Sequence, residues 1–254
     1  MILEEFDPNK EAVINPGGII NVIDGFPEVV VSCFSRVTFD RILSNYNPQQ
    51  IASVSFANLV IPVYKIEYRD TEIGLVNAYV GAAGSVGMFE DLTSMGMKKL
   101  LIFGTCGVLD ARIKDTSIII PNRAVRDEGT SYHYAPATDE IDTNVGMIAM
   151  LEDYFNRHDL SYTIGKVWTT DAFYRETRSK LERRKQAGCI AVDMECSALA
   201  AFAQFRGIEL IHFFYAADNL DTEVWDARSL SNHHRLDEKD AIASIALDIA
   251  YSVF

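Results

Sequence analysis

Strand-like and helix-like segments alternate along this chain of 254 residues, and this alternation restricts its possible folds more than any other feature. Apolar, β-branched runs typical of buried strands recur along the chain. They span residues 28–33, 59–66, 72–80, 99–104, 116–121, 161–168, 189–192 and 209–217. Helical patterns such as VTFDRILSNY, SVGMFEDLTSMG and SALAAFAQFRG lie between some of them. This order predicts a layered α/β fold with a largely parallel or mixed sheet.

The chain shows no internal boundary. Because no repeat, low-complexity run or Pro/Ser-rich linker divides it, we expect a single domain over residues 1–254. The runs 59–66 and 72–80 follow each other directly and predict an antiparallel hairpin. The C-terminal EKDAIASIALDIAYSVF predicts an amphipathic helix packed on the outside of the sheet.

The composition excludes several classes of function. A formal net charge of -13 argues against a nucleic-acid surface or an anionic membrane as partner. The N-terminus MILEEFDPNKEAV lacks the basic start of a signal peptide, and no apolar stretch reaches the ~20 residues of a membrane helix. The isolated cysteines indicate reduced thiols rather than a disulfide framework or a zinc site. They are Cys33, Cys106, Cys189 and Cys196. We therefore expect a soluble, cytoplasmic protein without a metal or an organic cofactor.

Ligands in open α/β sheets gather beyond the carboxyl ends of the strands. The segments near those ends are SCFSR, GAAGSVG, FGTCG, TTDAFY, VDME and AADN. In FGTCG, glycines flank Thr105 and Cys106 and bring backbone N–H groups close to an anion, although a tight strand exit also needs glycine. Arg36 in SCFSR is equally well explained as a surface cation, and Asp218 in AADN as a helix cap. Taken singly, none of these segments identifies a ligand.

The segment AVDMECSALAAFA, residues 191–203, places two carboxylates at the start of an apolar helix. Asp193 and Glu195 flank Met194 directly after the strand-like CIAV. Carboxylates are rarely buried without a partner. Either these two residues are a helix cap and a solvated side chain, or they face a ligand that donates hydrogen bonds to them.

A second polar segment, VRDEGTSYHYAP, follows the run TSIIIP. Its Arg126, Asp127 and Glu128 predict an ion-pair network. A histidine in an aromatic cluster is more often structural than catalytic, so His133 is left out of the chemistry.

The order GTCG, VRDEGTSYHYAP, TTDAFY, VDME and ADN resembles the nucleoside phosphorylase family. It is most similar to the branch that includes uridine phosphorylase, hexameric purine nucleoside phosphorylase and the methylthioadenosine/adenosylhomocysteine nucleosidases. The resemblance extends from about the first strand to AADN. It implies one α/β domain with a central mixed sheet flanked by helices. It also implies a homo-oligomer, a dimer or a hexamer, that acts on a nucleoside and inorganic phosphate.

The resemblance assigns roles around the sugar and the phosphate. Glu195 would accept hydrogen bonds from the ribose hydroxyls, and Met194 would pack on the sugar face. A vicinal diol offers two donors, which matches the acceptor-only chemistry of a carboxylate. Asp193 stands where the family usually has Glu. Thr105 matches the phosphate-binding Ser or Thr, and Arg36 is the one residue kept from the family's phosphate loop Gly-Asp-Pro-x-Arg.

The base pocket is assigned in the same way. Cys106 and Gly107 would form its floor, and Phe173 would stack on the base. Asp218 matches the Asp that protonates or hydrogen-bonds N7 of the leaving base in purine-cleaving members. Uridine phosphorylases recognise uracil with a Gln and an Arg that follow a TFY-like motif. In FYRETRSK of this chain, Thr177 and Arg178 are the nearest residues, and they are out of register with that pair. Asp218 therefore favours a purine.

The sequence departs from the phosphorylases in its cations. Ile102 stands where phosphorylases usually place an Arg, and no Arg for a neighbouring subunit is found in residues 49–60. Lys65, Arg123 and Arg126 are the remaining candidates for holding phosphate. The nucleosidases, which attack with water, use a Glu in the first loop, and SCFSR has none. We predict a purine-leaning nucleoside phosphorylase, with two alternatives: an N-glycoside hydrolase and a catalytically silent nucleoside-binding protein of the same fold.

Overall fold

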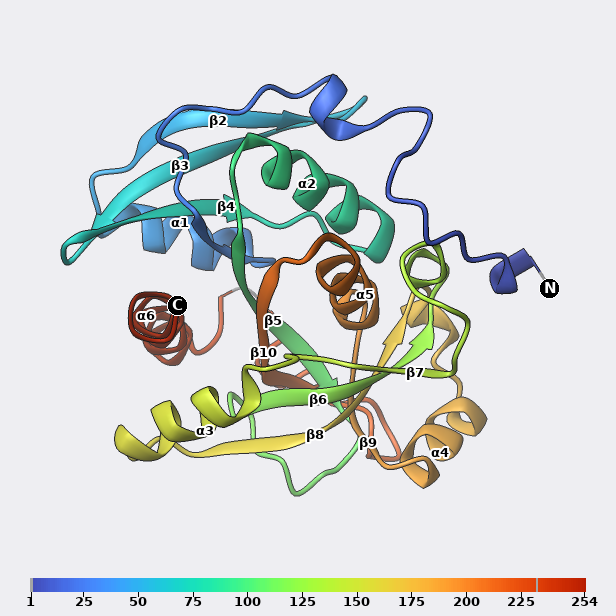
Figure 1. The fold of residues 1–254 in the computed structure, drawn as a ribbon. Helices are drawn as coiled ribbons and strands as arrows, with labels where there is room; N and C mark the ends of the chain where they lie inside the picture. Colours follow the sequence, from blue (N-terminus) through green and yellow to red (C-terminus); the bar gives the residue numbers. More distant parts are fainter. Residues whose placement is uncertain (1, 232) are drawn as a thin grey trace.

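The computed structural model describes residues 2–231 and 233–254, and the strands of this part form one ten-stranded sheet (Figure 1). The strands are β1 (Val29–Cys33), β2 (Gln49–Ser55), β3 (Val60–Tyr68), β4 (Thr71–Asn77), β5 (Lys99–Val108), β6 (Ile118–Asp127), β7 (Glu140–Asp142), β8 (Tyr162–Thr170), β9 (Cys189–Asp193) and β10 (Glu209–Asn219). The helices are α1 (Arg36–Ser44), α2 (Ala82–Met95), α3 (Ile148–Arg157), α4 (Arg178–Gln186), α5 (Cys196–Arg206) and α6 (Leu236–Ser252). Short 3₁₀ helices occupy η1 (Ile2–Glu4), η2 (Pro16–Gly18), η3 (Thr130–His133) and η4 (Phe173–Arg175).

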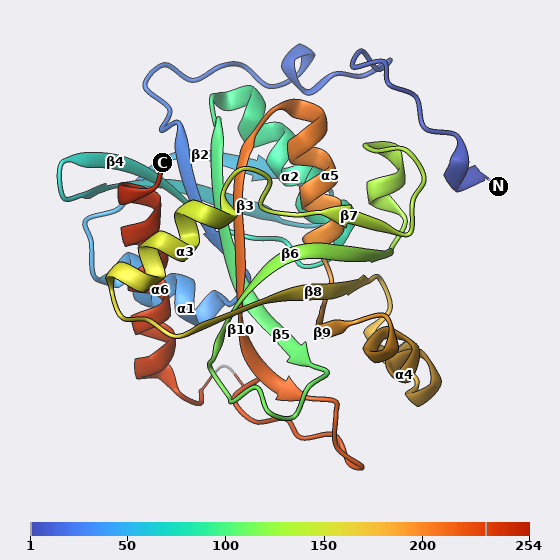
Figure 2. The same cartoon turned by 60° about the horizontal axis from the view of Figure 1, so that its bottom comes forward.

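Half of the sheet closes on itself. β5 pairs in parallel with β10, β10 antiparallel with β6, and β6 in parallel with β8. β8 then pairs in parallel with β9, and β9 returns to β5 in antiparallel orientation. β1 extends the sheet from β5, followed by β4, β3 and β2 (Figure 2). The mixed sheet confirms the predicted fold class, and the antiparallel β3–β4 pair confirms the predicted hairpin.

Helices cover both faces of the sheet. α2 and α5 pack together on one face, over a core that contains Phe89 and Phe202 (Figure 1). α1, α3 and α6 lie over the other, where the rings of Phe103 and Phe213 stack 5.5 Å apart. The predicted C-terminal helix is confirmed as α6, which packs against α1 and β1. No helix in the two described ranges is both long and apolar enough to cross a membrane.

The strands next to the predicted ligand edge are longer than expected. GTCG is not a turn after a strand, because Thr105, Cys106 and Gly107 all lie inside β5. Their backbone pairs with β10, where Thr105 faces Tyr215 and Gly107 faces Asp218 across a bulge. An added Cβ would meet the Phe34 ring at Gly104 and the Leu220 side chain at Gly107, so the two glycines make room for neighbouring side chains.

Four elements were not predicted. β2 is a mostly exposed edge strand, β7 is a strand of three residues, and α3 lies in a stretch to which no helix was assigned. α4, with the sequence RSKLERRKQ, buries only Leu181. A helix that buries one side chain leaves almost no apolar periodicity in its sequence.

Candidate active site

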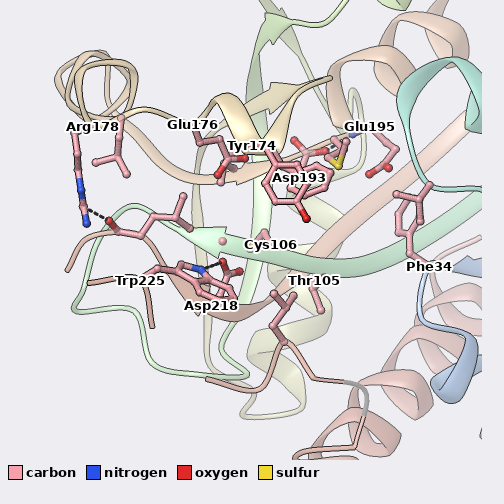
Figure 3. Close-up of a pocket in the computed structure, with 18 residues that line it drawn as sticks. Phe34, Thr105, Cys106, Tyr174, Glu176, Arg178, Asp193, Glu195, Asp218 and Trp225 are labelled. Atoms are coloured by element: carbon pink, nitrogen blue, oxygen red, sulfur yellow. Dashed lines mark hydrogen bonds between the residues drawn. The ribbon is translucent and has the colours of Figure 1, made fainter. Parts of the chain in front are cut away.

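A cavity of about 770 Å³ opens at the carboxyl ends of β5, β9 and β10 (Figure 3). It is lined mainly by apolar side chains, with a small set of polar groups among them, as is typical of ligand sites. The lining residues are Phe34, Val80, Thr105, Cys106, Gly107, Phe173, Tyr174, Glu176, Arg178, Leu181, Val192, Asp193, Met194, Glu195, Asp218, Leu220, Trp225 and Leu230. Every predicted site residue except Arg36 is in this set.

Asp193 holds the start of α5 in place. It is the last residue of β9, and its Oδ2 accepts hydrogen bonds from the backbone N–H groups of Glu195 at 2.7 Å and Cys196 at 2.6 Å. Its Oδ1 accepts a third from the hydroxyl of Thr169 at 2.8 Å. Burial nevertheless raises the pKa of Asp193 to about 6. With its oxygens engaged in this way, Asp193 acts as a cap that sets the direction of Glu195.

Glu195 is a buried carboxylate at the cavity wall. Its Oε1 accepts a hydrogen bond from the backbone N–H of Gly81 at 2.6 Å. Gly81 precedes α2 with a φ of 100°, a conformation that side-chain-bearing residues rarely adopt, so glycine is required there. Burial, and then the charge of Asp193, raises the pKa of Glu195 to about 8. A buried carboxyl with a raised pKa at a cavity wall is characteristic of a ligand site.

Asp218 lies in another part of the cavity, on β10 just after the bulge (Figure 3). Its Oδ2 accepts a hydrogen bond from the indole N–H of Trp225 at 2.8 Å. Burial raises its pKa, against the lowering effect of that hydrogen bond. A Cβ added to Gly107 would lie 2.4 Å from Leu220 Cδ1 and 3.2 Å from Asp218 Oδ1. Gly107 in β5 therefore makes room for the side chains of Leu220 and Asp218.

Aromatic side chains form the rim beside Asp218. Phe173 and Tyr174 come from η4, and their ring centroids are 4.1 Å apart. Phe173 is 49% exposed and Tyr174 is 88% exposed, so both rings stand at the opening rather than in the core. A planar base between such rings and the strand floor would gain stacking contacts.

Two charged residues of this end were not assigned a role from the sequence, although Arg178 was noted there as out of register. Glu176 lines the cavity, and burial followed by the charge of Asp218 raises its pKa to about 7. Arg178 also lines it, but its guanidinium donates to the carbonyl oxygens of Leu220 at 2.8 Å and Glu223 at 2.7 Å. FYRETRSK contained both residues, but their direction depends on the 3₁₀ turn that precedes α4, which has no periodicity to detect.

The predicted phosphate cation lies outside the cavity lining. Arg36 is the first residue of α1, its side chain is 63% exposed, and its Nε donates to Asp40 at 2.9 Å. The same SCFSR loop instead presents Phe34 to the cavity. The Phe34 ring covers Gly104, where an added Cβ would lie 2.6 Å from it. An aromatic ring from this loop, rather than its cation, therefore contributes to the cavity wall.

The other candidate cations are also engaged elsewhere. Lys65 pairs with Glu72 at 2.6 Å, and Arg123 pairs with Asp142 at 2.9 Å. Arg126 is buried and donates to the carbonyl oxygen of Pro136 at 2.6 Å. None of the three is a lining residue.

The predicted ion-pair network within Arg126, Asp127 and Glu128 is wrong. Neighbouring residues of a strand point to opposite faces, so Asp127 is directed away from Arg126. Asp127 pairs with Lys180 at 2.9 Å, while Glu128 accepts from the hydroxyl of Ser197 at 2.8 Å. Arg126 instead donates to the hydroxyl of Ser131 in η3 and to oxygens of Pro136 and Thr138 in the loop that follows it.

Acidic groups outnumber basic groups in the cavity lining. The lining holds four carboxyl groups and one guanidinium, and the guanidinium is already bonded to two carbonyls. The carboxyl groups belong to Glu176, Asp193, Glu195 and Asp218. In the described part of the chain, no three His, Cys, Asp or Glu side chains form a group that could hold a metal ion. The four carboxyl groups can take part in hydrogen bonding and proton transfer.

Known proteins share this sequence pattern and fold. The family model described as "Phosphorylase superfamily" matches residues 29–249. A DeoD-type purine nucleoside phosphorylase of Bacillus cereus is 28% identical over 185 residues, which cover 72% of this chain and 77% of that protein. A guanosine phosphorylase of Halorubrum lacusprofundi is 27% identical over 152 residues, 57% of this chain, and the match spans only 61% of that relative's length.

Solved structures agree on the fold. A uridine phosphorylase of Vibrio fischeri superposes with a TM-score of 0.76 at 20% identity, over 91% of this chain and 93% of that chain. The futalosine hydrolase of Helicobacter pylori gives a TM-score of 0.70 at 15% identity, over 90% and 99%. At these identities the likeness shows the fold alone. Because the family match spans most of the chain, this protein belongs to the phosphorylase superfamily, the family of nucleoside phosphorylases and nucleosidases.

Proposed function

We propose that this protein cleaves the N-glycosidic bond of a purine nucleoside and transfers the sugar to inorganic phosphate. One observation carries the proposal: a single cavity holds Glu195, Thr105, Phe173 and Asp218 together (Figure 3). Glu195 would accept hydrogen bonds from the sugar diol, and Phe173 would stack on the planar base. Asp218 would donate a hydrogen bond or a proton to N7 of that base.

The proposed reaction breaks the bond between the anomeric carbon and N9 of the base. The electron pair of that bond passes into the imidazole ring of the purine, and N7 accepts a proton from Asp218. The sugar becomes oxocarbenium-like, and an oxygen of phosphate forms the new bond to its anomeric carbon. Fixed carboxylates stabilise the positive charge that develops on the sugar. The products are the free base and the sugar 1-phosphate.

Phosphate as the acceptor is supported by sequence relatives that are named as phosphorylases and by Thr105 in the cavity wall. We also propose that the protein works as a homo-oligomer, a dimer or a hexamer. A neighbouring copy would then cover the exposed rings of Phe173 and Tyr174 at the opening.

Among the purines, we propose that guanine is preferred. Glu176 faces the base end of the cavity, and no hydrogen bond to its carboxylate is found within the described ranges. With a pKa of about 7, Glu176 is ionised above neutral pH, and in that form it only accepts, whereas guanine presents a ring N–H beside an exocyclic amino group. Adenine presents an unprotonated ring nitrogen at the same place, which would face the carboxylate lone pairs.

The charge of the lining favours a second candidate, hydrolysis. A phosphate dianion would enter a cavity with four carboxyl groups and one occupied guanidinium, beside the ring of Phe34. Water carries no charge and meets no such repulsion. The two candidates differ in one product, since water yields the free sugar.

The requirement for phosphate separates them. We expect release of base from guanosine or inosine to be at least about tenfold faster with millimolar phosphate than in phosphate-free buffer, because phosphate is then a substrate. The ³¹P NMR spectrum should show the sugar 1-phosphate as the product. Equal rates without phosphate, with free ribose as the product, would establish the hydrolase instead.

A further inference from the structure

The loop after β10 folds back over the cavity. Asn219 and Asp226 form an isolated antiparallel bridge, with backbone hydrogen bonds of 2.8 and 3.2 Å. This bridge turns the chain so that Trp225 returns beside Asp218 (Figure 3). The guanidinium of Arg178, at the start of α4, holds the loop by donating to the carbonyl oxygens of Leu220 and Glu223. Trp225 is thus placed by two independent anchors, although its side chain is 56% exposed.

The carboxyl group of Asp218 has unequal oxygens. Oδ2 accepts the indole N–H of Trp225 at 2.8 Å. Oδ1 lies close to Gly107 of β5. If residue 107 had a Cβ, that atom would be 3.2 Å from Oδ1. An indole N–H only donates, so the oxygen that it contacts carries no proton toward it. When Asp218 is protonated, the proton therefore belongs on Oδ1.

We propose that Trp225 is a positioning residue for the proton donor Asp218. Its N–H fixes the carboxyl group so that Oδ1–H is presented to N7 of the base, and it stabilises the carboxylate that forms as the proton leaves. This inference rests on the proposed cleavage of purine nucleosides.

The proton balance is simple. The C1′–N9 electron pair enters the purine, the proton passes from Asp218 Oδ1 to N7, and a neutral base leaves. Asp218 remains as a carboxylate with its Oδ2 bonded to Trp225, and it regains a proton from solvent before the next turnover. A donor aimed at a group that becomes negative during the reaction lowers the barrier of that step.

The test compares two substrates with one variant. Trp225→Phe keeps an aromatic ring over the cavity but removes the N–H. With inosine we expect kcat to fall by about 10- to 100-fold, the usual effect of losing a hydrogen bond to a charged group, with little change in KM. With 7-methylinosine, whose quaternary N7 takes no proton, kcat should be unchanged.

Controls separate positioning from folding. Trp225→His keeps a ring N–H and should recover part of the lost kcat, while Val224→Ala, an exposed neighbour in the same loop, should behave like the wild type. Thermal unfolding of each variant reports whether the fold is kept. An equal loss on both substrates, or no loss on inosine, overturns the role of Trp225 and leaves the proposed function intact. If the wild type released base from neither substrate, the proposed function would fall and this inference with it.

Discussion

Replacing Glu195 by glutamine is expected to remove nearly all nucleoside cleavage while making the folded protein more stable. In its ionised form, which predominates above pH 8, Glu195 would accept hydrogen bonds from two sugar hydroxyls, and an amide replaces only one of its two acceptor oxygens. Hydrogen bonds to a charged group contribute about 1.5–3 kcal/mol each, so we expect kcat/KM to fall by roughly 10²–10⁴-fold. Glu182→Gln, an exposed substitution on α4, is the matched control.

The gain in stability follows from the burial of the same group. Folding raises the pKa of Glu195 from 4.5 to about 8, so the folded state binds its proton more tightly than the unfolded state. Below pH 4.5 the carboxyl is protonated in both the folded and the unfolded state, so its ionisation does not change the free energy of unfolding. Between pH 4.5 and 8 the unfolded state ionises while the folded state keeps its proton, so the stability of the wild type falls as the pH rises, and by pH 9 it should be destabilised by on the order of 4 kcal/mol relative to the neutral variant.

Thermal unfolding at two pH values measures this effect. For a chain of this size the variant should unfold about 10 °C above the wild type at pH 9 and at nearly the same temperature at pH 4.5. Normal kinetics in Glu195→Gln would contradict its placement at the sugar. An equal change in unfolding temperature at both pH values would contradict the buried, titrating carboxyl.

Replacing Asp218 by asparagine is expected to lower kcat on purine nucleosides by about 10²–10⁴-fold, because general acid assistance contributes that much and an amide has no transferable proton. The substitution preserves the shape of the side chain beside Gly107 and an oxygen for Trp225. KM should change little, since the loss belongs to the transition state.

A second substrate shows whether the loss comes from proton transfer. A riboside with a p-nitrophenolate leaving group departs without a proton, so Asp218→Asn should cleave it at close to the wild-type rate. A comparable loss on both substrates would mean that Asp218 shapes the cavity rather than assisting the leaving base.

The sequence predicted the elements whose side chains face the core, and it missed the parts that depend on contacts between distant segments. β1, β5 and β10 were recognised because both of their faces are buried and their runs are apolar. The pairing of β5 with β10, which closes part of the sheet, could not be predicted. The two strands are about a hundred residues apart, and the periodicity of each run does not indicate its partner. α4 was not predicted because it buries only Leu181, so its sequence shows almost no apolar periodicity.

Most of the site residues that were predicted lie on strands or just after them, and those that were missed lie on loops. Thr105, Glu195 and Asp218 were found because they lie in or directly after recognisable strands, whose carboxyl ends meet at one edge. Trp225 and Glu176 were missed because loops carry them, and a loop's path depends on anchors such as Arg178. Arg36 was expected at phosphate from its place in the motif, yet the start of α1 directs it to Asp40.

The central claim is that this cavity cleaves a purine nucleoside, and chromatography of released base tests it most directly. The purified protein would be incubated with guanosine, inosine, adenosine and uridine in phosphate buffer. We expect free purine base, with guanosine turned over faster than adenosine and uridine slowest. Release of uracil in preference to any purine, or of no base from any of the four, would contradict the account.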